Sequence, residues 1–255
     1  MSESKLKRRS FLVGSGLALA GAGFAAGRFT AHRGRELPSG MDAAELAEMR
    51  LPPPSDPDEA LERLVNGNRL FVGEYYEVGD ARRNLRHRLT LAENQHPFAL
   101  IVGCSDSRVS PELLFSAGLG DLFVVRVIGN LVDPRSFSVI GSIEYAVHEF
   151  KIPLVMVLGH QQCGAVKAAI RVVQENIELP SAIDIVADSI RPIVLDVANQ
   201  AGDLVANAVA ANVRQGVKLL TTSTPLLDEP LAAGRLKVVG ATYDLKTGRV
   251  VLLNQ

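Results

Sequence analysis

The sequence predicts an α/β protein with a mainly parallel central sheet flanked by helices. Short and nearly continuous apolar runs have the length of buried strands, and segments with helical periodicity lie between them. Strands that alternate with helices are typical of a parallel sheet covered on both faces, and such strands are apolar throughout because both faces are buried. The expected strands are FALIVG (98–103), DLFVVRVIG (121–129) and PLVMVLG (153–159).

The first expected helix begins at Pro57, which suits the first helical position, with Asp56 as its N-cap and Glu59 placed to complete a capping box. Its apolar residues recur at helical spacing. Such a helix packs on its own core or lies across a partner subunit. Those apolar residues are Leu61, Leu64, Val65 and Leu70.

The remaining elements follow the same alternation of helices and strands. A strand, a Thr-Gly turn and another strand are expected in residues 235–253, near the C-terminus. No Gly-rich phosphate fingerprint follows any expected strand, so the sequence does not indicate a dinucleotide site. The expected helices are PELLFSAG (111–118), SFSVIGSIEYAVHEF (136–150), AVKAAIRVVQENI (165–177) and an Ala- and Val-rich region that runs to about Leu220.

The composition excludes some classes of protein. With 255 residues and 47% hydrophobic content, the chain can form one sizeable core or two small ones. The net charge of −1 gives no basic surface for a nucleic-acid partner. Aromatic residues are few and Trp is absent, so broad base-stacking surfaces are not expected.

The N-terminus has the features of an export signal. Lys5, Lys7, Arg8 and Arg9 precede an uncharged, Gly- and Ala-rich stretch at 11–27, which is short for a transmembrane helix. KRRSFLV resembles the twin-arginine motif, with Lys where Ser or Thr is usual. We therefore expect the twin-arginine machinery to export the protein, to the periplasm. The alternatives are a disordered basic tail, or an uncut signal that tethers the protein to a membrane.

These observations predict the organisation of the chain. The expected parts are an export signal and the start of a tether at 1–35, a linker at 36–56, and one folded domain at 57–255.

Two polar clusters, CSDSR (104–108) and HQQC (160–163), follow the first and third expected strands. In open α/β sheets, ligands bind beyond the carboxyl ends of the strands. Cys104, His160 and Cys163 together offer two thiolates and one imidazole, a set that suits tetrahedral zinc and leaves its fourth position open, as in catalytic sites. Two alternatives remain open: cysteines that are small buried hydrophobes, or a disulfide between them in an exported protein.

From about residue 57 to the C-terminus the sequence resembles the β-class carbonic anhydrases. CSDSR and GHQQCGAV correspond to the zinc signatures CxDxR and HxxC of that family, and GNRLF, GDLFVVRVIGN, SIEYAV and GATYDLKTGRV also agree. The resemblance implies the β-carbonic anhydrase fold, with the N-terminal helix packing on a partner subunit in a homodimer or higher homo-oligomer. It implies reversible hydration of CO2 to bicarbonate and a proton, by attack of a zinc-bound hydroxide, with one Zn²⁺ per subunit.

The resemblance also implies the roles of individual residues. Zinc is expected on Cys104, His160 and Cys163, beside a catalytic pair of Asp106 and Arg108. Arg108 can hold the Asp106 carboxylate with two hydrogen bonds and keep it ionised. The substrate pocket is expected to include Gln95, Phe123, Tyr145 and Gly164, with the two aromatic residues partly contributed across a dimer interface. Plain core packing remains an alternative for these aromatic residues, and a surface loop for Gln95.

The sequence departs from the family pattern at two places. Some proteins of the family bind bicarbonate at an inhibitory site that uses a Trp. Ile101 occupies the position of that Trp here, which puts the site in doubt, although Arg126 matches another residue of the site. Some members have a His four positions after Tyr145, where this chain has Glu149, so His148 is a weak candidate for a proton shuttle.

Two rival functions stay open at this point. One is a hydrolase of carbonyl sulfide or carbon disulfide on the same scaffold, and the other is a non-enzymatic bicarbonate or zinc sensor.

Overall fold

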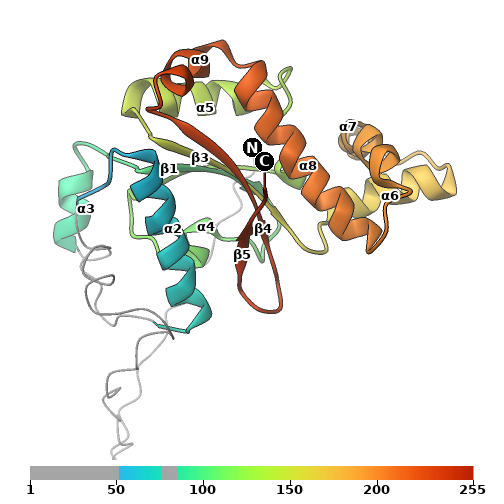
Figure 1. The fold of residues 1–255 in the computed structure, drawn as a ribbon, viewed down its shortest axis with the longest axis horizontal. Helices are drawn as coiled ribbons and strands as arrows, with labels where there is room; N and C mark the ends of the chain where they lie inside the picture. The colour runs from blue at the N-terminus through green and yellow to red at the C-terminus, as the bar shows by residue number, and fades with distance from the viewer. Residues whose placement is uncertain (1–51, 76–84, 255) are drawn as a thin grey trace, which may run out of the picture. The chain divides into compact units, whose positions relative to one another are not determined.

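The computed structural model describes residues 52–75 and 85–254. Its strands form one sheet in the order β2-β1-β3-β4-β5 (Figure 1). The first four strands are parallel, and β5 runs antiparallel to β4 at the edge. This confirms the α/β class and the mainly parallel sheet. The strands are β1 (Ala99–Cys104), β2 (Leu122–Val127), β3 (Leu154–His160), β4 (Lys237–Tyr243) and β5 (Val250–Leu252).

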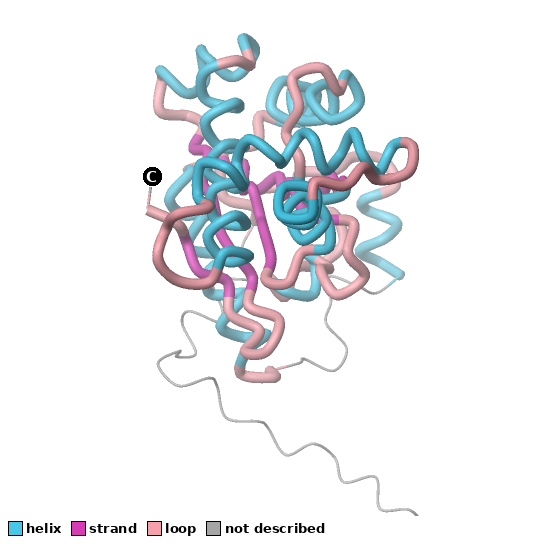
Figure 2. Tube along the Cα trace, turned by 90° about the vertical axis from the view of Figure 1, so that its right-hand side faces the viewer, coloured by secondary structure: helices cyan, strands magenta, loops and turns pink. Residues whose placement is uncertain are grey.

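Helices cover the sheet on both sides, as Figure 2 shows in the turned view. Within the described ranges, no helix is both long enough and apolar enough to cross a membrane. The helices are α2 (Pro57–Val72), α3 (Leu85–Leu91), α4 (Pro111–Leu114), the 3₁₀ turn η2 (Ile128–Asn130), α5 (Phe137–Phe150), α6 (Gly164–Glu175), α7 (Ala182–Val197), α8 (Leu204–Thr222) and α9 (Pro225–Ala232).

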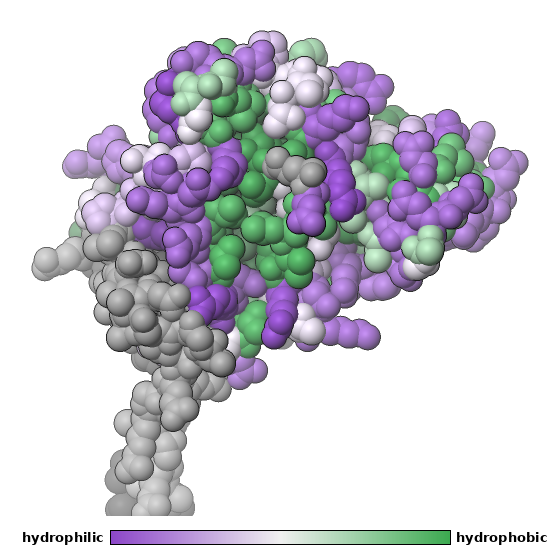
Figure 3. All heavy atoms as spheres, viewed as in Figure 1, coloured by the Kyte–Doolittle hydropathy of each residue, from purple (hydrophilic) through white to green (hydrophobic). Residues whose placement is uncertain are grey.

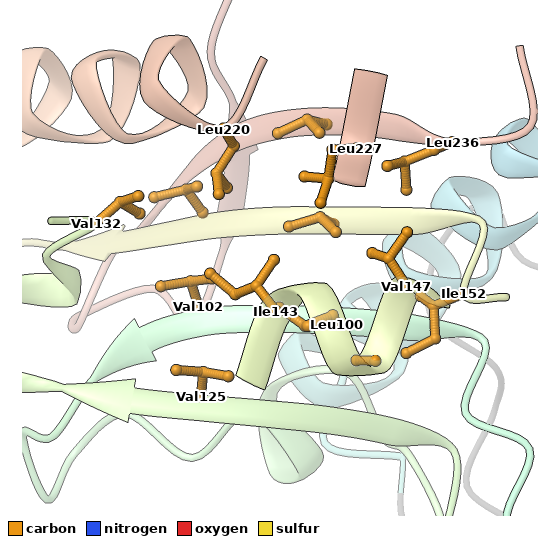
Figure 4. Packing of buried hydrophobic residues seen from close by; sticks show 14 of the residues in the cluster. Leu100, Val102, Val125, Val132, Ile143, Val147, Ile152, Leu220, Leu227 and Leu236 are labelled. Carbon is orange, nitrogen blue, oxygen red and sulfur yellow. The ribbon is translucent and has the colours of Figure 1, made fainter. Parts of the chain in front are cut away.

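Alternate residues of each central strand enter different cores. On β1, Leu100 and Val102 pack with α5, α8 and α9 on one face (Figure 4), whereas Ala99 and Ile101 pack with α2 and α4 on the other. Because successive side chains of a strand point to opposite faces, a strand buried on both faces must be apolar at every position. This is why the strands read as continuous apolar runs in the sequence.

The cap predicted for the first helix is confirmed. The Asp56 carboxylate accepts the backbone N–H groups of Asp58 and Glu59 at 2.8 and 3.1 Å, and Pro57 is the first helical residue. The helix α2 packs on its own subunit, against α4. A Cβ at Gly67 would lie 1.9 Å from the carbonyl oxygen of Phe115, so only glycine allows the two elements to approach so closely.

Several boundaries differ from the sequence prediction. The expected helix at 111–118 ends at Leu114, because the chain turns at Ser116, whose φ is 46°. The long Ala- and Val-rich region is two helices, α7 and α8, separated by a turn that includes Gly202 at φ 103°. Helices α3 and α9 were not expected. The expected turn before β5 is present, with Gly248 at φ 76°.

The expected export signal at 1–35 lies outside the described residues, as does most of the linker. The boundaries of these two segments remain predictions.

Candidate metal centre

The strand order brings the two polar clusters together. Cys104 is the last residue of β1 and His160 the last residue of β3, and these strands are parallel neighbours, so both residues lie at the same edge of the sheet. Cys163 follows as the N-cap of α6. One ligand atom from each of the three residues lies within 4.8 Å of the others, and all three residues are buried.

The cluster formed by Cys104, His160 and Cys163 lies at the carboxyl ends of β1 and β3, two neighbouring strands from which the chain continues in opposite directions. From β1 the chain connects to β2 on one side, whereas from the neighbouring β3 it connects to β4 on the other side. A crevice opens at such a point, because the connections leave the sheet in opposite directions, and ligands of open α/β sheets bind there. The position expected from the sequence is therefore also the position that the topology favours.

The orientation of the His160 ring suits a metal ligand. Its Nδ1 lies 2.9 Å from the carbonyl oxygen of Gln161. A carbonyl oxygen only accepts, so Nδ1 carries the proton and Nε2 keeps its lone pair. Nε2 is buried and has no hydrogen-bond partner among the described residues. A buried nitrogen lone pair beside two sulfur atoms fits zinc, which binds imidazole and thiolate.

Cys104 and Cys163 are both free thiols in this structure, and no disulfide joins them. The two sulfur atoms lie within 4.8 Å of each other, and their interaction lowers the pKa of Cys104 and raises the pKa of Cys163. Backbone N–H groups of Ala165 and Val166, in the first turn of α6, also act on Cys163 and partly oppose this rise in its pKa. A dication that replaces the proton between the sulfurs can bind both as thiolates.

A carboxylate held by an arginine lies beside the cluster. Arg108 donates from Nε to Oδ1 of Asp106 at 2.9 Å and from Nη2 to Oδ2 at 2.7 Å, and its backbone N–H also donates to Oδ1. These bonds hold the pKa of Asp106 well below its usual range. The Oδ2 atom of Asp106 lies 4.0 Å from Nε2 of His160, so the ionised carboxylate lies beside the atoms that would hold a metal ion.

Arg126 stabilises the loop that carries this pair, a role that the sequence analysis missed. From β2, its Nε donates to the carbonyl oxygen of Cys104 at 3.0 Å, and its Nη2 donates to that of Asp106 at 2.6 Å. The signal in the sequence was a single arginine within the apolar run LFVVRV.

The loop between β3 and α6 is also held in place. The backbone N–H of Gln161 donates to the carbonyl oxygen of Tyr243 at 2.9 Å, and its side-chain amide donates to Asp244 at 3.0 Å. These bonds fix the chain between His160 and Cys163 against the end of β4.

The expected pocket residues fall into two groups. Gly164 lies next to Cys163, and a Cβ there would meet nothing within 4 Å. Gln95 is exposed in the loop before β1, at the opposite end of that strand from Cys104. A single chain therefore does not bring Gln95 to the cluster.

Phe123 and Tyr145 also lie apart from the cluster. Phe123 pairs in register with Leu100, near the start of β1. The rings of Phe123 and Tyr145 both contact Phe150, with centroids 6.0 and 5.5 Å away, and Tyr145 is 54% exposed. These aromatic residues thus share the amino edge of the sheet with Gln95.

His148 has a local partner instead of the cluster, since its Nδ1 lies 2.9 Å from Oε1 of Glu149.

Known proteins are similar to this chain over most of its length. A family model described as carbonic anhydrase matches residues 99–250. The chain is 41% identical over 203 residues to a carbonic anhydrase of Mycolicibacterium smegmatis, covering 78% of this chain and 95% of that protein. It is 38% identical over 200 residues to carbonic anhydrase 2 of Mycobacterium tuberculosis, covering 78% and 94%.

Solved structures agree with the fold. A tetrameric β-carbonic anhydrase of Sordaria macrospora matches with a TM-score of 0.62 at 28% identity, covering 68% of this chain and 88% of that one. The β-carbonic anhydrase CcaA matches with a TM-score of 0.60 at 31% identity, covering 76% and 95%.

Proposed function

Because this chain belongs to the β-carbonic anhydrase family, we propose that its buried cysteine and histidine ligands hold the zinc with which it hydrates CO2 reversibly to bicarbonate. The proposed ligands are Cys104, His160 and Cys163, with Asp106 and Arg108 as the catalytic pair. The observation that carries the proposal is the doubly hydrogen-bonded Asp106 carboxylate beside the three ligand atoms.

The chemistry divides between the metal and the protein. Bound zinc supplies Lewis acidity, which makes a water molecule nucleophilic near neutral pH. The ionised Asp106 can only accept a hydrogen bond, so it would accept one from the nucleophile and leave a lone pair of that nucleophile directed at CO2. Arg108 keeps the carboxylate ionised and oriented, and Arg126 fixes the backbone that carries it.

Stopped-flow CO2 hydration by the zinc-loaded protein tests these roles. We expect Asp106→Asn to keep its zinc and to lose activity by about 100-fold, because an amide can present a donor where the nucleophile needs an acceptor. Asp133→Asn is the matched control, since Arg135 binds Asp133 with the same paired geometry. Full activity of Asp106→Asn would exclude the proposed role. Sulfide release from carbonyl sulfide, measured in parallel, shows whether the pocket also admits that substrate.

We also propose that the active unit is a homodimer or a higher homo-oligomer. Gln95 and the aromatic residues lie at the amino edge of the sheet, away from the cluster of their own chain, so a second copy must supply them if they serve the site. A groove of about 630 Å³ between α2 and β5 is lined mainly by apolar residues, together with Asn68, Arg69 and Arg249, and Figure 3 shows hydrophobic side chains on this face. The apolar lining includes Val65, Val72, Phe115, Met156, Val250, Val251 and Leu252.

Subunit mixing distinguishes a shared site from a self-contained one. Gln95→Ala and Cys163→Ala each damage one half of a shared site, so each homodimer should be impaired. A mixed dimer then has one intact site, and random reassortment of equal amounts restores about a quarter of the wild-type sites. No gain in hydration on mixing would rule out the shared site. Analytical ultracentrifugation gives the size of the oligomer.

The twin-arginine export of the protein to the periplasm is likewise a proposal, and it rests on KRRSFLV and the uncharged stretch after it. A reporter fused to residues 1–40 should leave the cytoplasm. Replacing Arg8 and Arg9 with Lys should stop it, because the pathway reads the arginine pair. Unchanged export of the double-Lys fusion would contradict this route.

A further inference from the structure

A buried asparagine is linked to the sulfur of Cys104 through one backbone residue. Asn212 is 5% exposed on α8, and its Nδ2 donates to the carbonyl oxygen of Gly129 at 2.9 Å. The backbone N–H of Gly129 donates in turn to Sγ of Cys104 at 3.3 Å. We propose that Asn212 is a positioning residue of the zinc site, which holds Gly129 so that its N–H remains on the thiolate. This rests on the proposed ligation of zinc by Cys104.

The conformation of η2 explains why an external hydrogen bond is needed. Gly129 has φ 67° and Asn130 has φ 47°, so two consecutive residues lie in the left-handed region. Glycine adopts this conformation freely and asparagine adopts it more readily than most residues, so the local sequence permits the turn but contacts from outside it must select this one conformation. Asn212 supplies such a contact, because its amide fixes the carbonyl group between these two residues.

Packing leaves Gly129 little freedom to move away from Asn212. A Cβ at Gly129 would lie 3.0 Å from Cβ of Ala165 on α6 and 3.3 Å from Cδ1 of Ile190 on α7. The turn is therefore enclosed by α6, α7 and α8. Since β2 pairs with β1 up to Cys104, the turn that follows β2 is adjacent to the cysteine sulfur.

The helix α8 also packs against β3, the strand that carries the histidine ligand. A Cβ at Gly159 would lie 2.5 Å from Val213 and 3.2 Å from Val209, so the helix rests directly on the residue before His160. Asn212 lies between these two valines on the buried face of α8. One rigid helix thus contacts the chain beside both strand-borne ligands.

The hydrogen bond on Cys104 has a chemical consequence. An N–H donor withdraws electron density from a thiolate, so the sulfur donates less to the metal and the metal keeps more of its Lewis acidity. Groups that hydrogen-bond to a ligand typically change metal affinity or activity by about 10–100-fold. Asn212 acts one step further away, so we expect an effect near the lower end of this range.

Cobalt substitution tests the proposal without relying on activity. In cobalt-loaded protein, a thiolate ligand produces a sulfur-to-metal charge-transfer band. Loss of the hydrogen bond raises the energy of the sulfur electrons, so in Asn212→Ala and Asn212→Asp the band should move to longer wavelength. Competition with a chelator should show zinc released about 10-fold faster from the same variants, because Cys104 loses the contact that orients it and this loss outweighs the stronger donation by its sulfur.

Asn68→Ala is the matched control. Asn68 is also buried, on α2, and its Nδ2 donates to the carbonyl oxygens of Leu114 and Gly248 at 3.0 and 2.9 Å. Asn68 Oδ1 also accepts the backbone N–H of Val250 at 2.9 Å, so this variant loses a buried asparagine and three hydrogen bonds to backbone, away from the metal ligands. The charge-transfer band of Asn68→Ala should stay at the wild-type wavelength, even though the protein is less stable.

The outcomes separate the two proposals. An unchanged band and unchanged zinc release in a folded Asn212 variant would overturn the role of Asn212 and leave the zinc ligands standing. Absence of the band in wild type would overturn the ligands as well. If both Asn212 variants fail to fold, NMR of the wild-type protein loaded with ¹¹³Cd decides. A coupling between the metal and the Gly129 amide proton supports the hydrogen bond, and its absence overturns the proposal.

Discussion

Arg108 holds the carboxylate of Asp106 with two parallel hydrogen bonds, and Arg135 holds Asp133 in the same way. Both pairs have the sequence Asp-x-Arg, and in both the arginine backbone N–H also donates to the carboxylate. Only Asp106 lies beside the cluster of Cys104 and His160. The chain therefore contains an internal control for the effect of such a pair on catalysis.

Arg108→Ala should retain zinc and lose about 100-fold in kcat/KM, because Asp106 loses its orientation. Arg135→Ala should leave kcat/KM unchanged. Arg108→Lys should recover only part of the activity, since an ammonium group cannot make the paired contact. Stopped-flow hydration with zinc content measured in each variant checks these expectations. Equal losses in Arg108→Ala and Arg135→Ala would indicate a general loss of folded protein instead.

The titration of Asp106 should depend on Arg108. The hydrogen bond from Arg108 holds the pKa of Asp106 below its usual value of 3.8. The depressed pKa stabilises the fold at pH values above 3.8, and this contribution is lost only as the pH falls below 3.8 through the folded pKa. Carboxyl ¹³C NMR should show Asp106 still ionised at pH 3.8 in wild type, with a raised pKa in Arg108→Ala. The same pKa in both proteins would show that Arg108 is not the cause of the shift.

Cys163→Ala should lose zinc and activity together. Removing a ligand should weaken zinc binding by more than the roughly 100-fold that follows loss of a group hydrogen-bonded to a ligand. Ser107→Ala, in the exposed part of the CSDSR loop, should keep its zinc. Elemental analysis after dialysis against a chelator measures both. A full complement of zinc in Cys163→Ala would remove Cys163 from the ligand set.

Two glycines should respond in opposite ways to alanine. At Gly67 the new Cβ would meet the backbone of Phe115, so Gly67→Ala should lower the free energy of unfolding by about 3 kcal/mol. At Gly141, within α5, a Cβ would meet nothing within 4 Å. Gly141→Ala should raise this free energy by up to about 1 kcal/mol, because alanine favours the helix. Urea denaturation at one protein concentration compares the two, and destabilisation of similar size in both would be the contrary result.

The sequence by itself determined the α/β class, the three central parallel strands and the residues expected to bind zinc. It could do so because these features rest on local patterns. A strand buried on both faces is apolar at every position, an N-cap lies next to its helix, and metal ligands need particular side chains at strand ends.

Only the tertiary structure decided how distant segments act on those residues. Arg126 fixes the Asp106 loop, and Asn212 reaches Gly129, because strand order and helix packing place them side by side. In this structure Gln95 and Cys104 lie at opposite ends of β1, although the resemblance to the family places both residues in one site. Contacts between residues far apart in the chain depend on the topology and packing of the whole sheet, and no local pattern encodes them.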